Sequence, residues 1–283
     1  MPMMLDPLHK LEEARSRALM PEKVYARVIE RYRYVTEGIE RVERASGIEY
    51  PEYYIEPRMV VADAEYGLGL MFARTIPVVK GMDESSSSYY GYSDSSLSIV
   101  IQVTAPLVAY GLKGTIHAIL AHEFLHYIEL LARFINMNIL SDEVTNSVFE
   151  SVYADMGRLV NPNRVFKKDR ALIRLLTRKF KDDGLSDHRL EGRCMKEWVE
   201  KGLPTARIRV EDNVARVPIE AIASLSIDEV LRSKIYEFIN ASSSKRSRNG
   251  KRRRGGSVED GIYGDEGRGQ GEGEGEEEGC CWY

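Results

Sequence analysis

The chain is poor in the features that mark secreted, disulfide-bonded and membrane proteins. It has three cysteines in 283 residues, too few for a disulfide framework, and its N-terminus lacks the basic-then-apolar order of a secretory signal. No uninterrupted apolar run approaches the roughly 18 residues of a membrane span. The longest mainly apolar segment, Ile116–Ile135, is interrupted by histidines and charged side chains. These absences predict a cytoplasmic protein with no membrane partner.

Net charge is also scarce, because 40 basic residues nearly balance 44 acidic ones to leave −4. The last 43 residues hold 11 of the 23 glycines, a basic block at Lys245–Arg254 and an acidic block at Glu272–Glu278. Such a segment cannot bury a core, and we expect 241–283 to be a disordered tail. Nucleic acid is not an expected partner, because the acidic block on the same tail counters the positive charge of the basic block. One alternative stays open: a nucleic-acid-associated protein whose function resides in the tail.

The periodicity of apolar residues changes twice along the chain. Helical spacing over Pro7–Ala45 predicts two amphipathic helices, the second beginning near Pro21. Three strands should follow, at Ile55–Ala62, Gly69–Ile76 and Leu97–Thr104, with a long polar surface loop at Asp83–Ser96. Five further helices are predicted at Ile116–Ile135 (N-cap Thr115), Ser141–Leu159, Asp169–Phe180, Leu190–Lys201 and Ile227–Ile239. A last strand, Arg207–Val217, should precede the final helix.

Helices, then strands, then helices is the order of an α+β protein. We expect N-terminal helices over residues 1–50 packing on the body, the main folded domain over 51–240 and the tail over 241–283. A mixed sheet should lie against the helix at Ile116–Ile135 and the helix that follows it.

Residues 122–126 read His-Glu-Phe-Leu-His, an instance of the HExxH pattern, inside a predicted helix. At 100° per residue, His122 and His126 lie 40° apart and one turn along, so both imidazoles can reach one metal ion. A zinc ion with three protein ligands keeps a water in its fourth position, and Glu123 can take the proton of that water as general base. The competing interpretation is a core helix whose histidines make ordinary hydrogen bonds.

With this motif, Leu97–Leu159 resembles the zincin superfamily of metallopeptidases. The metzincin branch requires glycine and histidine where this chain has Glu129 and Ala132. The resemblance is therefore to the gluzincin branch, whose third ligand is a glutamate on a following helix. It implies Zn²⁺ as cofactor, a peptide or protein as substrate, and Glu150, 24 residues after His126, as the third zinc ligand.

The third-ligand assignment departs from the family pattern in one respect. Gluzincins commonly carry an acidic residue four positions after the ligand, whereas Asp155 is five after Glu150, which turns it 140° away on a helix. Asp155 is thus a weaker candidate for orienting a histidine. Glu143 and Glu129 remain alternatives for the third ligand.

Gluzincins also often use a downstream histidine or tyrosine to stabilise the transition state. His188 is the histidine in that position here, and Tyr153 is an alternative. In zincins the strand that borders the cleft accepts substrate as an added strand, and we expect Leu97–Thr104 to do so, with Gln102 on its polar face.

These observations predict a zinc-dependent metallopeptidase with His122, His126 and Glu150 as metal ligands, Glu123 as general base and His188 as a second catalytic group. The alternative from another class is a non-catalytic zincin-fold protein that binds metal or peptide as a regulatory module. Glu123 discriminates between them, because a protein that only binds metal has no need of it.

Overall fold

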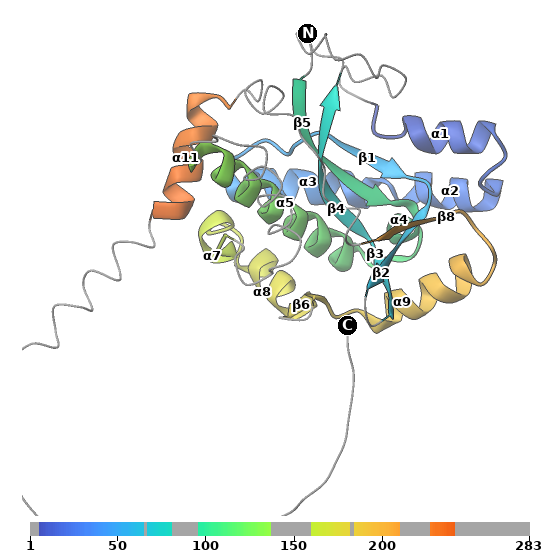
Figure 1. Ribbon diagram of the computed structural model, residues 1–283. Helices are drawn as coiled ribbons and strands as arrows, with labels where there is room; N and C mark the ends of the chain where they lie inside the picture. Colours follow the sequence, from blue (N-terminus) through green and yellow to red (C-terminus); the bar gives the residue numbers. More distant parts are fainter. Residues whose placement is uncertain are drawn as a thin grey trace, which may run out of the picture. The chain divides into compact units, whose positions relative to one another are not determined.

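The computed structural model describes residues 6–64, 67–80, 96–136, 160–181, 184–209 and 227–240 (Figure 1). Its N-terminal half contains α1 His9–Ser16, α2 Glu22–Arg31, α3 Arg33–Ser46, β1 Tyr53–Glu56, β2 Met59–Ala64, β3 Gly67–Met71, β4 Ala73–Lys80, β5 Ser96–Thr104, α4 Ala105–Tyr110 and α5 Lys113–Asn136. The C-terminal half contains α7 Pro162–Val165, α8 Arg170–Lys179, β6 Phe180–Lys181, β7 Gly184–Leu185, α9 His188–Cys194, the π-helix η3 Met195–Val199, β8 Thr205–Arg209 and α11 Glu229–Asn240. The described residues up to Ile239 belong to one compact unit.

The first sheet has the strand order β1-β5-β4, with β5 parallel to β1 and antiparallel to β4. In its register, Gln102 of β5 lies between Tyr54 of β1 and Arg74 of β4. The expectation that Leu97–Thr104 accepts an added strand is therefore wrong over Ile101–Thr104, where β5 has a neighbour on both sides, whereas Leu97–Val100 pairs with β4 alone among the described strands. Among the described strands, β4 lies at the edge of this sheet.

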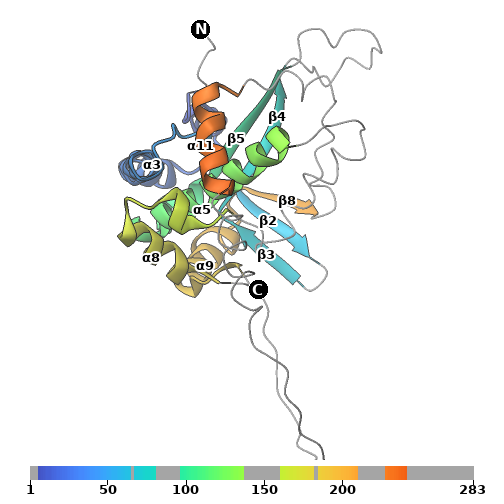
Figure 2. The same ribbon diagram turned by 90° about the vertical axis from the view of Figure 1, so that its left-hand side faces the viewer.

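The second sheet has the order β3-β2-β8 and is joined to the first through Phe72, between β3 and β4 (Figure 2). The predicted strands Ile55–Ala62 and Gly69–Ile76 each correspond to two strands. The first is interrupted at Pro57, which lacks the N–H that a continuing strand would donate. The second divides because the chain leaves one sheet and enters the other at Phe72.

Helix α5 runs through the core and packs against α3, α8 and β4 (Figures 1 and 2). Most of its own apolar side chains are buried, and four of them are fully buried: Ile116, Leu120, Phe124 and Ile128. The helix begins at Lys113, two residues before the expected cap. Among the described helices, none is long and apolar enough to span a membrane.

The N-terminal segment forms three helices where the spacing predicted two. Pro21 has extended backbone and precedes α2, in agreement with the expected start. The helix is then interrupted at Tyr32, which separates α2 from α3. Two arginines of α2 hold the C-terminal end of α4, since the Nε atoms of Arg27 and Arg31 donate to the carbonyls of Ala109 and Val108 at 2.8 and 2.9 Å. A helix leaves its last carbonyls without internal partners, and these guanidinium groups supply them.

The later helices largely follow the predicted boundaries. Asp169 caps α8, the predicted helix Leu190–Lys201 appears as α9 followed by η3, and the final helix appears as α11. Only Thr205–Arg209 of the last strand is described. The predicted helix Ser141–Leu159, loop Asp83–Ser96 and tail lie outside the described residues. Small mixed sheets combined with segregated helices confirm the α+β class.

The contact between α3 and α5 depends on a glycine. A Cβ atom on Gly38 would lie 2.7 Å from Leu120 Cδ1 and 3.0 Å from His117 Cδ2, and both of those side chains are buried. We expect Gly38→Ala to lower the free energy of unfolding by about 1 to 3 kcal/mol, because the core would be overpacked. Gly192→Ala in α9 is the control, since no atom lies within 4 Å of its added Cβ. It should stabilise the protein by roughly 0.5–1 kcal/mol. Urea unfolding measures both, and a Gly38→Ala variant as stable as wild type would contradict this packing.

A second prediction concerns Asp169, which caps α8 through Leu172 N (2.8 Å) and pairs with Arg41 Nε at 2.6 Å. The hydrogen bond from Arg41 holds the pKa of Asp169 below its ordinary value of 3.8. A lowered pKa stabilises the fold above the unfolded-state pKa, and that stability is lost as pH falls through the folded-state value. Asp169→Asn should retain the cap and lose this acid dependence, whereas Asp169→Ala should also lose about 1 kcal/mol of capping. Urea unfolding from neutral to acidic pH measures both effects, and parallel pH profiles for wild type and Asp169→Asn would argue against the ion pair.

Candidate metal and catalytic site

The HExxH motif lies in the middle of α5 and brings its two histidines together. The Nε2 atoms of His122 and His126 are 3.1 Å apart, and their rings are nearly perpendicular, at 87°. The two residues are one helical turn apart, which explains how both side chains reach the same point. The structure therefore confirms the helical setting of the motif and the convergence of its imidazoles.

Burial keeps both imidazoles neutral at pH 7. It lowers the pKa of His122 well below 6.5, with a further contribution from the neighbouring His126, and it lowers the pKa of His126 to about 4. Neutral imidazole is the form that ligates metals. Among the described residues, the buried Nδ1 atoms of both rings have no hydrogen-bond partner.

The ring of His122 is held by a residue that the sequence did not single out. Phe180, the first residue of β6, stacks on it with ring centroids 3.8 Å apart and an interplanar angle of 5°. A face-on aromatic contact restricts rotation of the imidazole and leaves its edge, which carries the nitrogens, pointing sideways. Phe180 is 58 residues away in the sequence, and no spacing rule links it to the motif.

Glu123 is buried beside the histidines and is contacted by the edge strand. Thr75 of β4 lies 3.0 Å from both the Oε2 atom and the main-chain oxygen of Glu123, and its single hydroxyl proton is shared between them. Burial raises the pKa of Glu123 to about 7, against the Thr75 hydrogen bonds and the charge of Arg74, which lower it. A carboxyl group with a pKa near neutrality can accept or release a proton at physiological pH.

Arg74 belongs to a buried polar row on the opposite face of the same sheet. Its Nε donates to Gln102 Oε1, while Gln102 Nε2 donates to Tyr54 Oη at 2.6 Å and to Glu56 Oε2 at 3.0 Å. Gln102 is only 2% exposed. Its amide is therefore used in holding strands together, and the expectation that the polar face of Leu97–Thr104 borders a cleft is wrong at Gln102.

The histidine pair fits two of the ligands of a zinc ion. Two nitrogens on one tetrahedral zinc, each about 2.0–2.1 Å from the metal, lie about 3.3 Å apart, close to the separation seen here. The described ranges contain no group of three metal-ligating side chains. Glu150, Glu143, Tyr153 and Asp155 lie outside those ranges, and the Glu129 carboxylate pairs with Arg133 at 3.1 Å.

His188 lies at the start of α9 with its side chain 83% exposed, and its Nδ1 is 3.2 Å from Glu191 Oε2. Its neighbour Asp187 has a structural role: it caps α9 through Leu190 N, accepts from Thr115 and pairs with Lys179. His188 thus contacts Glu191 within its own helix, and the structure does not bring it to the His122–His126 pair.

Comparison with protein-family models, with curated proteins and with solved structures finds no match for this chain.

The contact between Thr75 and Glu123 can be tested through stability. Thr75→Val keeps the shape of the side chain but removes the donor to a carboxyl group that is 7% exposed. Leaving a buried carboxylate without that donor should lower the free energy of unfolding by about 1–3 kcal/mol at neutral pH. Thr75→Ser keeps the hydroxyl and should lose less, and a Thr75→Val variant as stable as wild type would show that the hydrogen bond does not contribute to stability.

Proposed function

We propose that this protein is a zinc-dependent metallopeptidase of zincin type, which hydrolyses peptide bonds with Glu123 as general base. The observation that carries the proposal is the convergence of two buried, neutral imidazoles on α5, with Nε2 atoms 3.1 Å apart. Burying two histidines and a glutamate on an apolar helix is unfavourable unless they have a partner or a task. Glu123 accepts from Thr75 and the two Nε2 atoms contact each other, and a metal ion would give both imidazoles one shared partner.

In this proposal His122, His126 and Glu150 hold zinc. A zinc ion held by these residues would supply a water molecule with a pKa near neutrality and a Lewis acid for a carbonyl group. Glu123 takes the proton from that water at its carboxylate and later returns it to the leaving amine. In the metal-free chain burial raises the pKa of Glu123 to about 7, so a carboxyl group that can take up and release a proton near neutrality lies beside the two histidines.

The position of β4 supports a peptide as the substrate. Among the described strands, β4 has a neighbour on one side only, and its Thr75 contacts Glu123 directly. An extended peptide that pairs with this edge would pass next to the general base. This arrangement assigns to β4 the substrate-binding role that the sequence had suggested for Leu97–Thr104.

The role of Glu123 is tested by Glu123→Gln. This variant should retain zinc, because the ligands are untouched, and lose hydrolysis of an unstructured protein such as casein by about 100-fold or more. Zinc content by atomic absorption and peptide release by fluorescence measure the two properties. Hydrolysis retained in Glu123→Gln would contradict the mechanism, whereas a wild-type protein that binds zinc and does not hydrolyse casein would favour metal or peptide binding as the whole function.

The third ligand is tested separately with Glu150→Ala and Glu129→Ala. Loss of one of three protein ligands should weaken zinc binding by about 10-fold or more in Glu150→Ala. Glu129→Ala, which removes only the partner of Arg133, should keep wild-type affinity. Competition with a zinc-binding dye measures both, and the reverse result would transfer the ligand role from Glu150 to Glu129.

A further inference from the structure

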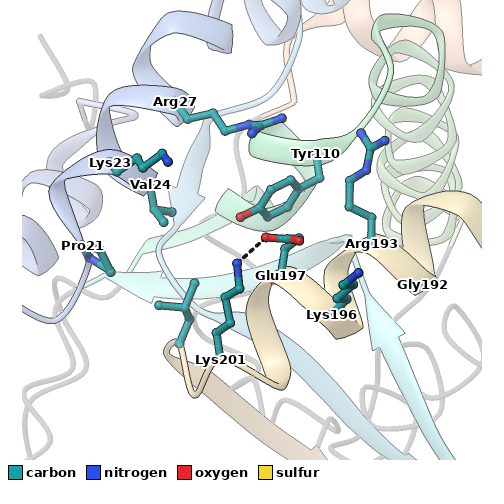
Figure 3. A pocket seen from close by; sticks show the side chains of 11 residues that line it. Pro21, Lys23, Val24, Arg27, Tyr110, Gly192, Arg193, Lys196, Glu197 and Lys201 are labelled. Atoms are coloured by element: carbon teal, nitrogen blue, oxygen red, sulfur yellow. Dashed lines mark hydrogen bonds and ion pairs between the residues drawn. The ribbon is translucent and has the colours of Figure 1, made fainter.

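A second site is formed far from the motif in sequence, where α2 faces α9 and η3. It is a pocket of about 850 Å³, a size typical of small-molecule sites (Figure 3). Its lining consists of five cations, one carboxylate and a set of apolar or small residues: Lys23, Arg27, Arg193, Lys196 and Lys201; Glu197; and Pro21, Val24, Tyr110, Gly192 and Leu203.

The charges of this pocket are unbalanced. Its carboxylate, Glu197, already pairs with Lys201 at 2.5 Å, which leaves cations on both walls without an acidic partner among the lining residues. Arg31, one helical turn after Arg27 on α2, has its pKa lowered by burial and also by the charges of Arg27 and Arg193. Because the whole chain is net acidic, at −4, this concentration of positive charge does not reflect composition.

The cations are also positioned by the fold. Arg27 donates through Nε to Ala109 O and lies 4.9 Å over the ring of Tyr110, so its other amino groups are presented from a fixed guanidinium. Lys196 and Glu197 belong to the π-helix η3, a rare conformation that occurs frequently at functional sites. Figure 3 shows Tyr110 between the two walls, with α2 on one side and Glu197 and Lys201 on the other.

We propose that this pocket binds a small molecule that carries two or more phosphate groups. A single carboxylate would neutralise one of the cations, whereas a diphosphate or triphosphate matches the excess on both walls. Val24, Leu203 and the Tyr110 ring provide an apolar surface for the rest of the molecule. The cations gather in one pocket of a net acidic chain, whereas a nucleic-acid surface spreads them along a stripe.

The test is isothermal titration of the full-length protein with pyrophosphate, ATP and sulfate, in low and in physiological salt. Pyrophosphate or ATP should bind at one site per chain, more tightly than sulfate and more weakly as salt rises. Lys196→Glu should weaken binding about tenfold or more, as expected for the loss of a charge-assisted contact. Lys168→Glu reverses the same charge at an exposed lysine outside the pocket and should leave binding unchanged.

A second variant separates pocket occupancy from charge. Gly192→Leu adds a side chain where no atom lies within 4 Å of the new Cβ, so it should occupy the pocket without disturbing the fold. It should weaken binding about tenfold or more while the unfolding temperature stays at or above the wild-type value.

Three results would overturn the proposal: no saturable binding of pyrophosphate or ATP, equal losses in Lys168→Glu and Lys196→Glu, or tighter binding of a short single-stranded RNA that Gly192→Leu also blocks. The last result would make the pocket part of a nucleic-acid site. None of these measurements depends on peptidase activity, so they succeed or fail independently of the function proposed for α5.

Discussion

The burial of three ionisable side chains on one helix is the constraint on which the rest of the structure depends. His122, Glu123 and His126 lie within an otherwise apolar stretch of α5, and moving them from water into the core disfavours their charged forms. Burial therefore lowers the pKa of both histidines, which keeps them neutral, and raises the pKa of Glu123 to about 7.

Each element that packs on α5 contributes to holding it or its polar groups in place. The edge strand β4 supplies the Thr75 hydroxyl, the hairpin that follows α8 supplies the Phe180 ring, and α3 approaches closely at Gly38. The same hairpin leads into α9 and η3, which form one wall of the basic pocket. Consecutive segments of the chain, β6 to η3, therefore contribute to both proposed sites.

The sequence predicted the features that depend on local order. Helical periodicity and the HExxH spacing placed His122, Glu123 and His126 on one helix, and the start of α8 was expected at Asp169, whereas the expected cap Thr115 lies inside α5. It could not predict strand partners, because β5 has the same alternation whether it is central or at an edge. Thr75 and Phe180 were also missed, since their contacts with the motif arise from tertiary packing. Pro57 was the local signal that could have divided the first predicted strand.

The central claim is that His122 and His126 are two ligands of one zinc ion. X-ray absorption spectroscopy on the zinc-loaded protein, compared with a His122→Ala/His126→Ala double variant, tests it most directly. The account predicts two imidazole nitrogens and at least one oxygen at about 2.0–2.1 Å from the metal, and loss of the imidazole signal in the double variant. A zinc environment without imidazole, or one unchanged by the double substitution, would contradict it.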